Sequence, residues 1–190
     1  MNFFKTLIAL LFITLGFHSF AQDKEKTDAA AGSKKPKKET KISEVINTDS
    51  VSANVLLNRA VNWVKHETNK YDKVNGVTTA GKAECIATFT VKPKELNAQC
   101  DYTGVITMKV IIESKTGKYK YTINQISHKS KGGKTSMGSI DNLIPECGSM
   151  SMPEIVMKKL RGEALKCANI VVEDLKEAML KDSLEPVEEW

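Results

Sequence analysis

The four cysteines, Cys85, Cys100, Cys147 and Cys167, are the side chains of this sequence with the most evident chemistry. Their wide spacing excludes a Cys-x-x-Cys redox motif and the paired ligands of a zinc site. In an exported chain, an even number of cysteines favours disulfides. Cys85 lies on the apolar face of a predicted strand and Cys167 in the apolar stripe of a predicted helix, so we expect the pairs Cys85–Cys167 and Cys100–Cys147. The alternative is a set of buried thiols that behave as small apolar side chains, because a helix and a sheet are often too far apart for a disulfide.

One short pattern, Gly133-Lys134-Thr135, invites a phosphate-binding interpretation. A phosphate loop needs a glycine five positions before Gly133, where His128 stands, so we expect a basic loop instead. The sequence also lacks the His-Glu-x-x-His zinc motif and the Gly-x-Ser-x-Gly nucleophile motif. We therefore predict no catalytic residue, no metal and no cofactor. The alternative is a hydrolase-type enzyme with a site in the loops around residues 128–139.

The first 21 residues have the three-part layout of a secretory signal peptide. One cation, Lys5, precedes an apolar run at 6–17, and the small residues Ser19 and Ala21 mark a cleavage site after Ala21. The apolar run is too short to span a bilayer comfortably, so we expect cleavage rather than a retained anchor. The sequence thus predicts an exported protein, periplasmic or extracellular.

Charge is unevenly distributed along the remaining chain. The net charge of +5 falls to +4 without the signal peptide, and residues 22–41 carry +3 of it, from seven Lys and four acids. This segment has no apolar periodicity, so we expect a disordered basic linker, with contact to an anionic envelope surface as the alternative. Because the basic surplus lies mainly there and export removes the usual partner, we predict no nucleic-acid binding. The predicted domain spans residues 42–182, and an acidic tail follows at 183–190.

Apolar spacing predicts the helices and strands of the 42–182 domain. In chain order they are a strand at 42–46, a helix from Ser50 or Ser52 to about Thr68, a weak strand at 71–74 that turns at Asn75-Gly76, a strand at 83–91, a hairpin at 102–126, a loop at 129–141 and a long helix that begins near Ser151.

The hairpin has a well-specified register. If Thr116-Gly117 form its turn, Val110 opposes Ile123 and Ile112 opposes Tyr121, so the two apolar faces coincide. The same pairing brings Glu113 next to Lys120 on the other face.

The final helix has one apolar stripe, and only one face of the central strands is rich in large apolar side chains. Both helices should therefore cover that face and leave the other open. We predict a two-layer α+β domain with an antiparallel sheet. The residues of the stripe are Val156, Leu160, Ala164, Cys167, Val171, Leu175 and Ala178.

Three segments of the sequence contain further local patterns. They are the strand, turn and helix at 42–64, which includes Leu57-Asn58-Arg59-Ala60-Val61-Asn62-Trp63; the stretch 76–89; and the hairpin 110–128, which includes Gly117-Lys118-Tyr119-Lys120-Tyr121. Together they resemble a family of exported bacterial domains of unknown function with a TATA-binding-protein-like (TBP-like) fold, frequent in Bacteroidetes. The resemblance covers about residues 42–128 and, loosely, the final helix. It implies a curved sheet with the order β-α-β-β-β-β-α, no established activity and no catalytic residues, and it does not include the cysteines.

The open face of the predicted sheet carries the candidate binding residues Lys109, Lys118, Lys120, Asn124 and His128. The stretch 109–134 holds seven Lys and one acid, so this face should be basic. We expect a non-enzymatic binding or scaffolding domain whose open face binds an anionic envelope partner: a glycan, a lipid or a protein, including the acidic segment 173–190 of a second copy. The alternatives are a structural module that self-associates, and a basic strip that is only solvated surface.

Overall fold

The computed structural model of the protein describes residues 39–93 and 100–180. The predicted signal peptide, residues 22–38 of the predicted linker and the predicted acidic tail lie outside the described residues. Within them, the chain forms two helices and six strands. Their bounds are β1 Ile42–Asn47, α1 Ala53–Lys65, β2 Asp72–Thr79, β3 Lys82–Val91, β4 Gly104–Lys115, β5 Lys118–Ser130, β6 Gly138–Ser139 and α2 Glu154–Leu180.

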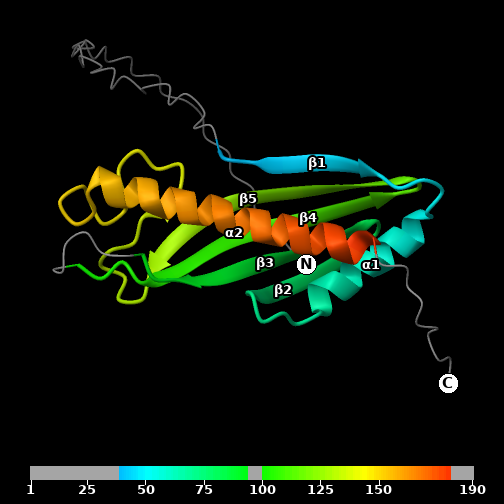
Figure 1. The fold of residues 1–190 in the computed structure, drawn as a ribbon, viewed down its shortest axis with the longest axis horizontal. Helices are drawn as coiled ribbons and strands as arrows, with labels where there is room; N and C mark the ends of the chain where they lie inside the picture. The colour runs from blue at the N-terminus through cyan, green and yellow to red at the C-terminus, as the bar shows by residue number, and fades with distance from the viewer. Residues whose placement is uncertain (1–38, 94–99, 181–190) are drawn as a thin grey trace, which may run out of the picture. The chain divides into compact units, whose positions relative to one another are not determined.

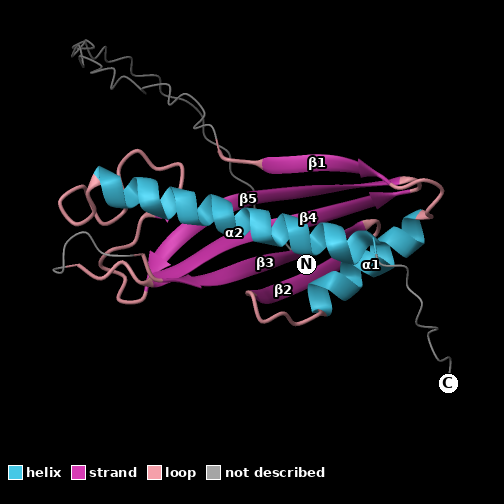
Figure 2. Cartoon of the chain, in the orientation of Figure 1, coloured by secondary structure: helices cyan, strands magenta, loops and turns pink. Residues whose placement is uncertain are grey.

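The strands form one curved antiparallel sheet in the order β1-β5-β4-β3-β2, and the short β6 also pairs with β5. Both helices lie on the same side of this sheet, and α2 runs along the length of the strands (Figures 1 and 2). The predicted two-layer α+β architecture with one open sheet face is therefore confirmed. Neither described helix is long and apolar enough to cross a membrane.

The β4–β5 hairpin has the predicted register over most of its length. Val110 pairs with Ile123 and Ile112 with Tyr121 across the turn at Thr116-Gly117. Gly117 has a φ of 75°, a conformation that glycine adopts without the steric penalty of a side chain.

The core lies between the two helices and the inner face of β3, β4 and β5. Burial alternates along β3 and β4, as expected for strands with one face against the helices. Leu56 of α1, Leu160 and Leu175 of α2, and Val110 and Ile112 of β4 are all 0% exposed. The apolar stripe predicted for the final helix therefore forms the centre of the helix–sheet interface.

The structure differs from the prediction at Asn75-Gly76, which does not form a hairpin turn. Strand β2 continues through these residues with a bulge between Val74 and Val77, and Asn75 has a φ of 55°. A Cβ at Gly76 would lie 2.7 Å from Cγ1 of Val64, so glycine lets α1 pack closely over the bulge. The chain turns five residues later, at Ala80-Gly81.

Candidate functional site

A groove of about 630 Å³ lies on the open face of the sheet. Its floor comes from β3, β4 and β5, and its wall comes from the residues that flank β1 and β6. Most of the strand residues, Ile86, Thr107, Lys109 and Ser127, have the parity opposite to the core, which alternation turns away from the helices. Met108 and Ile126 are core side chains, 0% and 2% exposed, that only underlie the floor. The lining residues are Glu39, Ile86, Thr107, Met108, Lys109, Gln125, Ile126, Ser127, Ser139 and Asp141.

A β-bulge at Gln125 shapes this groove. Gln125 has a φ of 52°, and the β4–β5 register shifts by one residue between Thr107 and Lys109. On its other edge, β5 pairs with β1 up to Ile123 and with β6 from Ser127 onward. The bulge therefore lies in the interval between two partner strands, where the backbone of β5 is not part of a regular ladder.

The chain in front of β1 closes this interval. The backbone N–H of Gln125 donates to Oε1 of Glu39 (3.0 Å). The backbone N–H of Thr40 donates to Oδ2 of Asp141 (2.9 Å), and the Thr40 hydroxyl also donates to the Asp141 carboxylate. Glu39 and Thr40 thus belong to the ordered domain, so the linker boundary that we predicted at Lys41 is too late.

The one lysine on the groove floor, Lys109, is paired with a carboxylate beside the groove. Lys109 Nζ lies 3.1 Å from Oε1 of Glu84, and Lys82 Nζ lies 2.7 Å from Oε2 of the same carboxylate. Hydrogen bonds from Lys82 and Lys109 hold the pKa of Glu84 below its usual range. With Glu39 and Asp141 on the rim, the groove carries more acidic than basic groups, so it does not favour a polyanion.

The predicted basic strip is not one continuous basic surface. Lys109 pairs with Glu84, as described above, and Lys120 pairs with Glu113 at 3.4 Å, as the hairpin register predicted. Lys118 is exposed beside the hairpin turn, at the end of β5 distant from the bulge. Asn124 is half-buried next to the bulge, and its Oδ1 is buried without a hydrogen-bond partner among the described residues. Of the five candidate residues, Lys109 alone lines the groove.

The prediction that His128 faces outward is wrong. The side chain is 1% exposed, because the bulge at Gln125 reverses the inside–outside parity of the rest of β5. The ring is hydrogen-bonded on both sides. The Met137 N–H donates to Nδ1 (3.4 Å), so the proton of the neutral ring is on Nε2, which donates to the Tyr102 carbonyl (3.2 Å). Burial lowers the pKa of His128, and the ring cannot reach a ligand in the groove.

The four cysteines are thiols and fall into two classes. Cys85 and Cys167 are buried, and burial raises the pKa of each to about 11. They lie among different neighbours, Cys85 near Lys73 and Cys167 near Glu163, and the expected Cys85–Cys167 disulfide is absent. The interpretation as small apolar side chains describes these two. Cys100 and Cys147 are half-buried near the opposite end of the sheet from the hairpin turn, and the expected disulfide between them is likewise absent.

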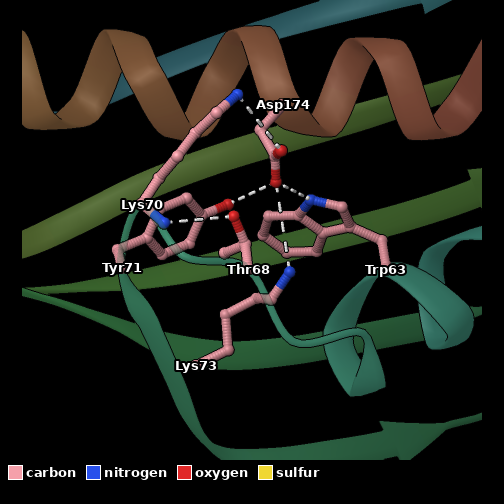
Figure 3. A network of polar contacts seen from close by, with 6 residues as sticks. All are labelled: Trp63, Thr68, Lys70, Tyr71, Lys73 and Asp174. Atoms are coloured by element: carbon pink, nitrogen blue, oxygen red, sulfur yellow. Dashed lines mark hydrogen bonds and ion pairs between the residues drawn. The ribbon is translucent and has the colours of Figure 1, made fainter.

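A polar cluster on the helix side of the sheet joins three elements (Figure 3). The Asp174 carboxylate of α2 accepts hydrogen bonds from Trp63 Nε1 of α1 (2.8 Å) and from the Tyr71 hydroxyl in front of β2 (2.6 Å). The ammonium groups of Lys70 and Lys73 lie 3.9 and 4.0 Å from it. Burial disfavours the charged form of Asp174, but these four groups outweigh burial and hold its pKa below the usual range.

The sequence-based search missed this cluster, although two signals were present. Asp174 directly precedes Leu175 of the apolar stripe, and Lys73 has the inward parity of the predicted weak strand. The Lys73 side chain is 3% exposed, and its Nζ lies 4.5 Å from the centre of the Trp63 ring. We interpret the cluster as a clamp that fixes both helices to β2, because the Asp174 carboxylate accepts hydrogen bonds from Trp63 and Tyr71. The buried Lys73 Nζ has no hydrogen-bond partner among the described residues and is held by the charge of Asp174 and the ring of Trp63. Among the described residues, no group of three or more His, Cys, Asp or Glu is placed to hold a metal ion.

Comparison with known proteins finds a matching family model over part of the chain and a matching fold. The family model described as "Domain of unknown function (DUF4468) with TBP-like fold" matches residues 43–129. A TBP-like protein from Parabacteroides distasonis has a TM-score of 0.57 and 11% identity, over 76% of this chain and 95% of that chain. A DUF4468 family protein from Bacteroides ovatus has a TM-score of 0.53 and 9% identity, over 78% of this chain and 90% of that chain. No curated protein matches the sequence significantly. The resemblance to a TBP-like family is thus confirmed, and at such identities the structural likeness concerns the fold alone.

Proposed function

Since residues 43–129 of this chain form a domain of the DUF4468 family, of unknown function and TBP-like fold, we propose that the protein is an exported, non-enzymatic binding domain. Its partner occupies the groove on the open sheet face. Export rests on the signal-peptide pattern of residues 1–21.

The observation that carries this proposal is the groove itself. A volume of about 630 Å³ falls within the range of ligand-binding sites. Its lining combines apolar surface from Ile86 with the hydroxyl groups of Thr107 and Ser127 and the amide of Gln125. Such a lining can bury an apolar group and hydrogen-bond a polar backbone at the same time.

The pairing of the groove's charged groups favours binding over catalysis. Lys109 has Glu84 as its partner, Asp141 has Thr40, and the Glu39 carboxylate accepts the N–H at the bulge. A general acid or base has to reach the substrate, whereas these groups already hold the walls of the groove together.

The chemistry of the lining also selects the kind of partner. Its single lysine, Lys109, is paired with a carboxylate, and Glu39 and Asp141 are acidic, so electrostatic attraction of an anionic glycan or lipid is weak there. Hydroxyl and amide groups over an apolar floor suit an extended, largely uncharged segment of a partner protein. We therefore propose that the partner is a protein of the cell envelope rather than a glycan or a lipid.

Site-specific photo-crosslinking tests the proposal. A photoreactive phenylalanine analogue at Thr107 should crosslink a discrete partner in the envelope of the native host, whereas the same analogue at the exposed Thr79 of β2 should not. Adding the substitution Ser127→Trp, which fills the groove, should abolish the Thr107 crosslink. Equal crosslinking from both positions, or a crosslink that survives Ser127→Trp, would contradict binding in the groove.

Self-association is a second candidate, favoured by one observation. Strand β2 is an outer strand of the sheet, and its side chains Val74 and Val77 are 44% and 48% exposed. An exposed apolar edge strand can pair with a second copy. Light scattering of the parent protein and of Val77→Lys distinguishes the cases: a dimer that the substitution dissociates supports pairing through β2, and a monomer at all concentrations excludes it.

A further inference from the structure

We propose that Cys100 and Cys147 form an oxidisable pair that closes to a disulfide and thereby fixes the loop on one side of the groove. This proposal rests on the proposed export for its oxidising surroundings. It does not depend on the identity of the partner or on binding in the groove.

The first observation is a hydrogen-bonded bridge between the two cysteine-bearing segments. The Thr135 hydroxyl donates to the carbonyl of Asp101 (2.6 Å), directly after Cys100. The N–H of Cys147 donates to the carbonyl of Ser136 (3.2 Å). Because Thr135 and Ser136 are consecutive, this short stretch holds both cysteine-bearing segments against itself.

A second contact ties the same two segments together from the other side. The Tyr102 hydroxyl donates to the carbonyl of Ser151 (3.1 Å), and the Tyr102 ring is 3% exposed. The chain on the C-terminal side of Cys100 is therefore fixed both to the stretch before Cys147 and to the stretch after it. The two thiols lie in one small region of the domain, although 46 residues separate them in the sequence.

The accessibility of this pair distinguishes it from the other two cysteines. Cys100 and Cys147 are half-buried, so an oxidant can reach them, whereas Cys85 and Cys167 are 2% and 6% exposed. Burial raises the pKa of Cys147, and a negative charge on Cys100 raises it further, as expected for two neighbouring sulfur atoms. The thiolate is the reactive form, so oxidation should be slow at neutral pH and faster in mild alkali.

The reaction is an ordinary thiol–disulfide exchange with a low-molecular-weight disulfide such as oxidised glutathione. One cysteine thiolate attacks the glutathione disulfide, forms a mixed disulfide and releases one glutathione thiolate. The second cysteine, as its thiolate, then attacks the protein sulfur of that mixed disulfide and releases the second glutathione. The protein loses two protons and two electrons, and one glutathione disulfide takes them up to become two reduced glutathiones.

The position of the link connects it to the groove. The loop that ends at Cys147 begins after Met137 and carries Ser139 and Asp141, both of which line the groove. The Glu146 N–H donates to the carbonyl of Met137 (3.2 Å), which closes this loop at its base. A disulfide from Cys147 to Cys100 would anchor the base of the loop to the segment in front of β4.

The test uses the full mature chain equilibrated with oxidised glutathione at mildly alkaline pH. Peptide mapping without reduction should recover Cys100 linked to Cys147, with Cys85 and Cys167 as thiols that react only after unfolding. The melting temperature should rise by roughly 5 to 10 °C on oxidation, because the link restricts the unfolded chain. Cys100→Ser and Cys147→Ser should each abolish this rise, and Cys85→Ala should retain it.

Two results would overturn the proposal. In the first, the wild type carries glutathione separately on Cys100 and Cys147 and forms no internal link. In the second, the linked peptide contains Cys85 or Cys167. Circular dichroism of each serine variant shows whether it is folded, so a lost link is not confused with a lost fold. Failure of the groove to bind a partner would change neither the peptide map nor the rise in melting temperature.

Discussion

Replacing Asp174 by Ala should strongly destabilise the domain, because it removes the centre of the clamp between α1, β2 and α2. The substitution leaves the Trp63 Nε1–H and the Tyr71 hydroxyl without their shared acceptor. It also leaves the Lys73 ammonium, on a side chain that is 3% exposed, without its carboxylate partner. The Asp174 side chain itself is 19% exposed, so solvent screens these interactions only in part.

The magnitude follows from these contacts. A hydrogen bond to a charged group is worth about 1.5–3 kcal/mol, and removing one partner of a buried ion pair costs about 3–5 kcal/mol. These contributions overlap, so we expect Asp174→Ala to lower the free energy of unfolding by about 3–5 kcal/mol. Asp174→Asn retains a carbonyl acceptor but loses the charge, and should cost about 1–3 kcal/mol.

Urea unfolding, followed by circular dichroism at pH 7, measures these differences. Glu173→Ala is the matched control, since Glu173 is its exposed neighbour on the same helix, and should change stability by less than about 0.5 kcal/mol. Combining Asp174→Ala with Lys73→Met removes both charges, so the double variant should recover at least about 1 kcal/mol relative to the sum of the single effects. If Asp174→Ala costs no more than Glu173→Ala, or if the two sites show no coupling, Asp174 does not act as a clamp.

The same cluster predicts a dependence of stability on pH. The pKa of Asp174 is lower in the folded protein than in the unfolded chain, so its contribution is fully present above the unfolded value of about 4 and is lost as the pH falls below it. The wild type should therefore lose more stability than Asp174→Asn when the pH is lowered from 4.5 toward 2.5. Parallel acid-unfolding curves for the two proteins would contradict this assignment.

Three further predictions concern the core and the second half of β5. Leu160→Ala should lower the free energy of unfolding by about 2–4 kcal/mol, whereas Leu165→Ala, at a position 43% exposed on the same helix, should lower it by under about 1 kcal/mol. Equal losses in urea unfolding would refute the orientation of α2. Gly104→Ala should destabilise by about 1–3 kcal/mol, because its Cβ would lie 2.3 Å from a backbone oxygen, whereas Gly132→Ala meets no atom within 4 Å and should be nearly neutral by the same measurement. Since burial lowers the pKa of His128, the wild type should lose thermal stability as the pH falls from 7 to 5, and His128→Gln should lose less. Identical slopes of melting temperature against pH for the two proteins would contradict a buried neutral ring.

Much of the fold could be predicted because its local patterns agree with its long-range packing. The hairpin register followed from the turn at Thr116-Gly117 and from the coincidence of two apolar faces. The structure has this register from the pair Lys109–Asn124 to the pair Lys115–Lys118. The stripe of α2 followed from helical periodicity, and Leu160 and Leu175 occupy the core as expected.

The two errors in the strands share one physical cause, which is a β-bulge that changes strand parity. Asn124-Gln125 interrupts an alternating strand without glycine or proline, and this bulge turns His128 inward. Asn75-Gly76 does carry a turn signal, but the same left-handed conformation also serves a bulge, and packing against Val64 decides between the two. The groove could not be predicted because it exists only where the bulge of β5 meets the segment in front of β1.

That segment also determines how the groove relates to the rest of the chain. Glu39 both caps the bulge and lines the groove, so the polypeptide in front of it is covalently attached at the groove's edge. A probe attached to the chain directly before Glu39 would therefore report from the edge of the groove without altering any residue that lines it.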